Sequence, residues 1–136
     1  FTLEPDHPNT FGPDKRPLHT IIPGMTMRDG RCDMSFGVMG GGYQPMGHVQ
    51  IVNNMRDYGM DIQQAIDCPR FFFDGEKTLV ESGTPQATID GLTVRGHTVA
   101  KAELPWGGAQ AIKIDWDRGV LIGGSDPRKD GLAFGY

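Results

Sequence analysis

Three consecutive glycines, Gly40–Gly42, are the residues whose type and spacing are best suited to chemistry. They lie between a short apolar segment and a stretch with helical spacing. Their unhindered N–H groups would therefore lie at the N-terminus of a helix, where the helix dipole favours negative charge. The pattern predicts a site for an anion, which includes an oxyanion that develops during acyl transfer and needs only two well-aimed N–H groups. A tight turn with positive φ angles is the structural alternative, and the local sequence alone favours that turn.

Two phosphate-binding motifs can be tested against the same residues. A P-loop needs Lys and then Ser or Thr after its second glycine, but His48 and Val49 follow Gly47. The dinucleotide-binding fingerprint needs a small residue three positions after Gly42, and Pro45, which has no N–H to offer, occupies that position. Both phosphate-binding interpretations are therefore excluded.

The other chemically capable side chains form no complete catalytic set. The 4 histidines are scattered without the spacing of metal ligands, so the sequence predicts no metal site and no cofactor. The serines lack the Gly-x-Ser-x-Gly elbow, and Cys68 has no evident base, so we interpret it as a structural thiol. Arg70 and Arg128 each follow a proline. They could bind carboxylates, but salt bridges that hold a loop are the favoured interpretation.

The segments beside the glycines are expected to position them. Cys32–Met39 is short, largely apolar and free of proline, as is typical of a core strand. After the glycines, apolar residues recur at three-residue spacing and predict a helix over Met46–Tyr58 that ends at Gly59. A turn at Arg28–Arg31, with Asp-Gly at its centre, would pair a strand over Leu18–Met27 antiparallel with Cys32–Met39.

The rest of the chain reads as short elements between turns. Pro23-Gly24 argues for an edge position or a bulge in the first strand. Asp61 and Gln64 form a capping-box pattern that opens a short helix through Asp67. A weak helix is expected between Thr84 and Gly96. Further strands are expected at Arg70–Phe73, Thr78–Glu81, His97–Leu104, Gln110–Trp116 and Val120–Gly123. The predicted fold class is α+β, with mostly antiparallel strands and two or three short helices.

Length and composition limit the classes of protein to which the chain can belong. The chain has 136 residues, with 20 Gly and 10 Pro, and we interpret it as a single piece with an extended segment at 1–17 and an α+β body at 18–136. A net charge of −4 without a basic cluster argues against a nucleic-acid partner. No apolar stretch is long enough for a membrane span, and the two cysteines leave the compartment open. Because the sequence starts at Phe1, we expect it to be a piece of a longer chain.

Several short motifs occur in the order found in one enzyme family. They are Arg16–Pro23, Gly37–Gly42, Asp57–Met60, Ala65–Arg70, Gly123–Arg128 and Gly131–Tyr136. Together they span nearly the whole sequence. The chain resembles the C-terminal part of the small subunit of the gamma-glutamyltransferases, also called gamma-glutamyltranspeptidases, in their bacterial gamma-glutamyltransferase-like branch.

The resemblance implies part of an N-terminal-nucleophile hydrolase, whose fold is an αββα sandwich. In that family a precursor cuts itself, and a threonine becomes the first residue of the small subunit. This threonine attacks a gamma-glutamyl amide with its own α-amine as base, forms an acyl-enzyme, and passes the acyl group to water or an amino acid. By position, Gly40 and Gly41 match the paired glycines whose N–H groups form the oxyanion hole. The implied partners are a gamma-glutamyl or related small amide and the remaining large- and small-subunit segments of the precursor.

His19 and Thr20 stand where the best-known members have two serines that hold the substrate α-carboxylate. Thr20 keeps a hydroxyl and His19 does not, which resembles bacterial relatives that act as amidohydrolases or acylases on other small amides. The nucleophilic threonine falls upstream of Phe1 in the family pattern, so the 136-residue chain alone is expected to be inactive. The alternative is a catalytically silent binding or structural relative with the same fold.

Overall fold

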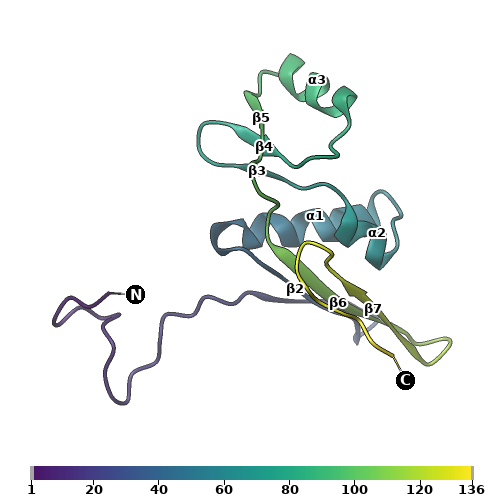
Figure 1. Cartoon of the computed structure of the whole chain (residues 1–136). Coiled ribbons are helices and arrows are strands. Elements are labelled where there is room, and N and C mark those ends of the chain that lie inside the picture. Colours follow the sequence, from purple (N-terminus) through teal and green to yellow (C-terminus); the bar gives the residue numbers. More distant parts are fainter. Residues whose placement is uncertain (1, 136) are drawn as a thin grey trace.

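The computed structural model describes residues 2–135. Its main layer is an antiparallel sheet with four strands in the order β1-β2-β6-β7. The strands are β1 (Pro23–Arg28), β2 (Arg31–Met39), β6 (Gly108–Asp115) and β7 (Val120–Ser125). Helices α1 (Gln44–Arg56) and α2 (Ile62–Asp67) cover one face of this sheet (Figure 1).

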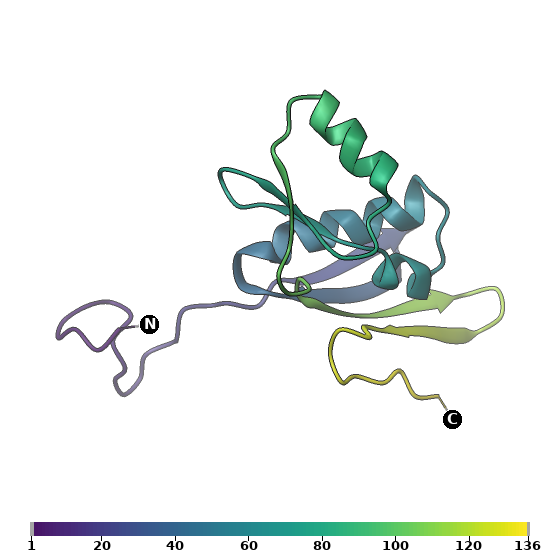
Figure 2. The same ribbon diagram turned by 45° about the horizontal axis from the view of Figure 1, so that its top comes forward.

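A smaller layer lies on the far side of these two helices (Figure 2). It consists of β3 (Phe71–Phe73), β4 (Thr78–Val80), helix α3 (Gln86–Val94) and β5 (Val99–Lys101). In this three-stranded sheet β3 and β4 are antiparallel, whereas β4 and β5 are parallel because α3 provides the crossover. The architecture confirms the predicted α+β class with mostly antiparallel strands, and it contains three α-helices in the described residues.

The first hairpin forms where the sequence predicts it. Asp29 and Gly30 both have positive φ angles, 50° and 75°, which suits a tight turn between twisted strands. β1 lies at an edge of the sheet, as Pro23-Gly24 indicates, but the irregularity in its register lies between Thr26 and Met27. The hairpin therefore presents β2 to the centre of the sheet.

The strand expected over Leu18–Met27 starts too early, because β1 begins only at Pro23 and Leu18–Ile22 is not part of a strand. Pro23 pairs with Gly37, which leaves two residues of β2 before the chain turns away at Gly40. β2 therefore offers partners for at most two residues before Pro23, too few for a strand that starts at Leu18. The arm before β1 holds an isolated bridge between Thr2 and Thr10 and extends away from the body (Figure 1).

Helix α1 begins at Gln44, two residues earlier than predicted, with proline in its first turn. It ends at Arg56 rather than Tyr58, and Gly59 follows with a φ of 67°. The capping box of α2 is confirmed. The Gln64 N–H donates to Asp61 Oδ1 over 2.8 Å, and the Asp61 N–H donates to Gln64 Oε1 over 3.0 Å.

The core lies between the four-stranded sheet and the α1–α2 layer. Helix α1 approaches β2 closely at Gly47, where a β-carbon would lie 2.8 Å from Val38 Cγ1. This contact requires glycine and sets the spacing between the two layers. The buried cluster comprises Met34, Phe36, Val38, Tyr43, Ile51, Ile62, Ala65, Ile66, Ala109 and Ala111.

The opposite face of the sheet is apolar and exposed in this chain. Because side chains alternate along a strand, Met25, Ile112 and Leu121 point away from the core. They are 61%, 50% and 68% exposed, respectively.

No helix within residues 2–135 combines the length and the apolar character needed to cross a membrane.

Candidate active site

The three glycines form the connection between β2 and α1. Gly40 directly follows β2 and has a φ of 132°, which is open to glycine but strained for other residues. A β-carbon there would also lie 3.1 Å from the Gly107 Cα atom. Gly41 begins a 3₁₀ turn, η1 (Gly41–Tyr43), with a φ of 58°. The predicted order of elements, a strand followed by a glycine turn and a helix, is therefore confirmed.

Hydrogen bonds define the orientation of two successive peptide groups in this turn. The Tyr43 N–H donates to the Gly40 carbonyl over 3.1 Å. The Gln44 side-chain amide donates from Nε2 to the Gly41 carbonyl, also over 3.1 Å. The N–H groups in the first turn of a helix have no intrahelical acceptor, so the turn has donors to offer a ligand.

A groove of about 590 Å³ runs along the turn and the end of the sheet. Thr20, Gly40 and Gly41 all line it, together with Gln44 and Gln110. Most of the remaining wall is apolar and comes from Ile21, Ile22, Pro23, Phe36, Val38 and Met39. The groove therefore combines a glycine turn at one place with an apolar surface beside it.

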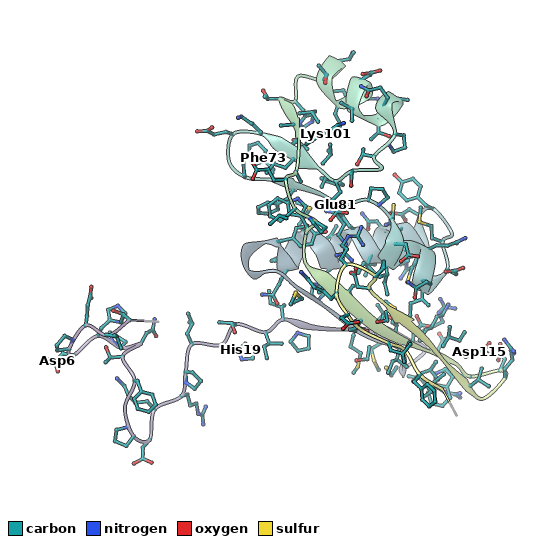
Figure 3. All side chains as sticks on the ribbon, viewed as in Figure 1. Asp6, His19, Phe73, Glu81, Lys101 and Asp115 are labelled. Carbon is teal, nitrogen blue, oxygen red and sulfur yellow. The ribbon has the colours of Figure 1, made fainter. Side chains whose placement is uncertain are left out.

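The structure places the two candidate substrate-binding residues differently. Thr20 lines the groove, and its carbonyl accepts a hydrogen bond from Gln44 Nε2 over 2.9 Å. His19 lies one residue further out on the arm and is exposed (Figure 3). It is not among the groove-lining residues, so the chain brings Thr20, Gly40 and Gly41 together and leaves His19 outside.

A network of four charged side chains, three of them buried and Arg128 partly buried, lies outside the lining of the groove. Arg70 donates to Asp126 Oδ2 over 2.5 Å, and Arg128 donates to Glu81 Oε2 over 2.6 Å. Arg128 also reaches Asp126 Oδ1 over 3.3 Å, which joins the two pairs. The interpretation of Arg70 and Arg128 as salt bridges that hold loops is confirmed. Sequence reasoning missed Glu81 and Asp126 as their partners, although Asp126 stands only two residues before Arg128.

The environment of this network favours the charged forms of Asp126 and Arg128. Burial raises the pKa of Asp126, but N–H donors from Arg128 and Ala109 and the Arg70 guanidinium outweigh it, so the pKa is lowered. Burial lowers the pKa of Arg128, but hydrogen bonds and the charge of Glu81 raise it overall. Burial also raises the pKa of the nearby Tyr43 phenol, which stays neutral. The network is thus a charged, structural unit.

His48 packs against Phe36, and the two cysteines are free thiols. His48 Nδ1 lies 2.7 Å from the Gln44 carbonyl, and its ring lies 5.0 Å from that of Phe36. Cys32 and Cys68 are both free and partly buried. Over residues 2–135, no group of three or more His, Cys, Asp or Glu side chains is arranged to hold a metal ion.

The fold defines the class of protein: this is part of an N-terminal-nucleophile hydrolase. The family model described as Gamma-glutamyltranspeptidase matches residues 1–136. The chain therefore belongs to the gamma-glutamyltranspeptidase family, a family of enzymes that includes glutathione hydrolases and acylases.

Individual relatives agree with this assignment. The chain is 39% identical to the glutathione hydrolase-like YwrD proenzyme of Bacillus subtilis (strain 168), over 99% of the chain and 27% of that protein. A cephalosporin acylase from Bacillus halodurans superposes with a TM-score of 0.79 at 41% identity, over 97% of the chain and 25% of the acylase. A gamma-glutamyltranspeptidase from Helicobacter pylori superposes with a TM-score of 0.76 at 27% identity, over 95% of the chain and 77% of the matched chain. The chain thus spans about a quarter of the curated relatives that it matches.

Proposed function

We propose that this chain is the C-terminal part of a gamma-glutamyltransferase-like amidohydrolase that acts through a threonine acyl-enzyme. A self-cleaving precursor supplies the nucleophilic threonine and the rest of the large and small subunits. The chain itself supplies the oxyanion hole through Gly40 and Gly41, and part of the pocket for the substrate carboxylate. The substrate is a gamma-glutamyl amide or a related small amide.

The observation that carries this proposal is the shared groove of Thr20, Gly40 and Gly41. An oxyanion hole needs donors that are oriented before the reaction, because reorientation during the reaction would cost free energy. A trans peptide is planar, so its C=O and N–H point in opposite directions. The bond from Tyr43 to the Gly40 carbonyl therefore also directs the Gly41 N–H, away from Tyr43.

The chemistry has two steps in this proposal. The threonine hydroxyl adds to the amide carbon while its α-amine takes the proton, and negative charge develops on the carbonyl oxygen beside the glycine N–H groups. The amine then leaves with the proton, and an ester to threonine remains. Water or an amino acid attacks this ester through a second oxyanion at the same donors, which releases the acyl product and restores the threonine.

Thr20 and His19 are proposed to contribute to substrate choice. The Thr20 hydroxyl is available to a carboxylate or another acceptor on the acyl group. His19 offers an imidazole at the end of the arm. The range of relatives, from glutathione hydrolases to acylases, makes amides other than gamma-glutamyl ones reasonable substrates to test.

Turnover by the full-length protein tests this proposal. The purified protein should release nitroaniline from gamma-glutamyl-4-nitroanilide or from other 4-nitroanilides of small acyl groups. Mass spectrometry after a rapid acid quench should find the acyl group on the N-terminal threonine of the small subunit. Binding of these amides with neither turnover nor an acyl adduct would favour the silent relative instead.

A further inference from the structure

We propose that Gln44 is a positioning residue that ties the Thr20 wall of the groove to the glycine turn. A primary amide has two N–H hydrogens, and Gln44 Nε2 has two carbonyl partners. One is Thr20, at 2.9 Å, and the other is Gly41, at 3.1 Å. The two acceptors are 21 residues apart in sequence, and both of their residues line the groove. This inference rests on the proposed acyl-transfer function and adds a residue to its site.

The bond to Gly41 acts on the glycine turn. Glycine peptides change orientation easily because no β-carbon restricts their φ and ψ angles. The Tyr43 N–H holds the Gly40–Gly41 peptide by its carbonyl. Gln44 holds the next peptide, Gly41–Gly42, by the Gly41 carbonyl, which accepts from both the backbone N–H and the side-chain Nε2 of Gln44. The held Gly40 carbonyl directs the Gly41 N–H, a donor of the proposed oxyanion hole, whereas the held Gly41 carbonyl directs the Gly42 N–H and so fixes the turn that follows it.

The bond to Thr20 acts on the arm. Thr20 is exposed and lies before the first residue of β1, so no sheet hydrogen bond holds its backbone. Gln44 is the first residue of α1 and is therefore carried by a rigid helix that packs on β2. The Gln44 side chain thereby fixes the distance between Thr20 and the glycine turn. An acyl group that contacts both would depend on that distance.

Two substitutions separate hydrogen bonding from space filling. Gln44→Met keeps a side chain of similar length and removes both side-chain bonds, while the backbone N–H of residue 44 still donates to the Gly41 carbonyl. Gln44→Glu keeps nearly the same shape but places a carboxylate against two carbonyl oxygens. If the side chain only filled space, Glu would be the milder change. Under the proposal Glu is the more damaging of the two, because it replaces attraction by repulsion.

Gln63 provides the matched control. Its Nε2 also donates to a backbone carbonyl, that of Ser125, over 2.8 Å, and its Oε1 accepts from the Ser125 N–H over 3.0 Å. It lies outside the groove. Gln63→Met therefore removes a comparable bridge and should reduce stability without a change in kcat/KM. A merely structural role for Gln44 would make the two methionine variants alike.

The experiment uses the full-length protein with these three variants and the parent. Gln44→Met should lower kcat/KM for the best 4-nitroanilide substrate about 10- to 100-fold, as expected when reacting groups are misplaced by about 1 Å. Gln44→Glu should lower it further, and Gln63→Met should stay within about 2-fold of the parent. An active parent whose Gln44→Met variant keeps kcat/KM within that range would overturn the inference and leave the proposed function intact.

A second measurement does not depend on activity. Thermolysin cleaves before apolar residues, so the bond between Thr20 and Ile21 reports on the mobility of the arm. The proteolysis is run under native conditions, and mass spectrometry maps the cleavage sites. Cleavage at this bond should be several-fold faster in Gln44→Met than in the parent or in Gln63→Met. If the parent hydrolyses no amide, the proposed function fails and this measurement alone decides. Faster cleavage then supports the tie between Gln44 and Thr20, and unchanged cleavage overturns it.

Discussion

The Arg70 guanidinium and the Asp126 carboxylate meet over 2.5 Å, with exposed fractions of only 2% and 0%. Arg70 directly precedes β3 in the small layer, and Asp126 directly follows β7 in the main sheet. Asp126 Oδ2 also accepts the Ala109 N–H over 2.6 Å, where β6 begins. This ion pair therefore joins the small layer to the centre and edge of the sheet.

Arg70→Met should lower the free energy of unfolding of the full-length protein by about 3–5 kcal/mol, because it leaves a buried carboxylate without its main counter-charge. Urea denaturation followed by tryptophan fluorescence measures this loss. The double variant Arg70→Met/Asp126→Asn should be less destabilised than the single one, since both charges are then removed and the Asn side-chain oxygen still accepts the Ala109 N–H. Single and double variants with equal losses would contradict this account.

The stability of the folded protein at acidic pH should depend on the lowered pKa of Asp126. Its ordinary value is 3.8, so the unfolded chain binds a proton near that pH while the folded chain does not. The contribution of Asp126 to stability is full above the unfolded pKa and is lost as pH falls through the lower folded pKa. The Tm should therefore drop steeply below about pH 4. Asp126→Asn should start from a lower Tm at neutral pH and show a shallower decline.

Gly41→Pro should reduce kcat of the full-length enzyme about 10²- to 10³-fold, the usual loss for one oxyanion donor. Proline has no N–H, and it cannot adopt the φ of 58° at this position, so circular dichroism must first show an intact fold. Gly41→Ala is the control, because it keeps the N–H, its β-carbon meets no atom within 4 Å, and it carries a milder strain from the same positive φ. A well-folded proline variant with kcat within a few-fold of the parent would mean that the glycines are only a turn.

His19→Ser should change which amide binds rather than how fast a good substrate is acylated. His19 is exposed on the arm, whereas Thr20 lines the groove, so a substitution at His19 leaves the glycine turn untouched. We expect the KM for gamma-glutamyl-4-nitroanilide to change while kcat stays largely intact. Steady-state kinetics with several acyl groups measure the two parameters. An effect confined to kcat would argue against a role in substrate binding.

The isolated 136-residue chain should expose an apolar surface and show no amidase activity. Met25, Ile112 and Leu121 lie exposed on the face of the sheet away from α1 and α2, and the unpaired edges of β1 and β7 add to this surface. Binding of a hydrophobic dye and self-association in sedimentation are the expected readouts. A strictly monomeric chain without dye binding would contradict the prediction, and Ile112→Lys should weaken both signals.

Several local structures of this protein follow from its sequence alone, because they depend on interactions between residues close together in the chain. Asp29-Gly30 specifies a tight hairpin turn, because both positions accept positive φ angles. Asp61 and Gln64 specify the start of α2, since each side chain satisfies an N–H within three residues. The strand, glycine turn and helix around Gly40 could also be predicted, because residue type and spacing within one segment specify them. The order of the short motifs along the chain also indicated the gamma-glutamyltranspeptidase family, to which the chain belongs.

Only the tertiary structure decided which distant segments meet. β6 lies between β2 and β7, and the Arg70–Asp126 pair spans 56 residues of sequence. The expected start of the first strand at Leu18 was wrong for the same reason, since a strand needs a partner and β2 ends two residues after the one that pairs with Pro23. The bond between Gln44 and Thr20 likewise depends on where the helix places one amide. Such pairings arise from packing and hydrogen bonding over long sequence separations, which no local pattern of residues encodes.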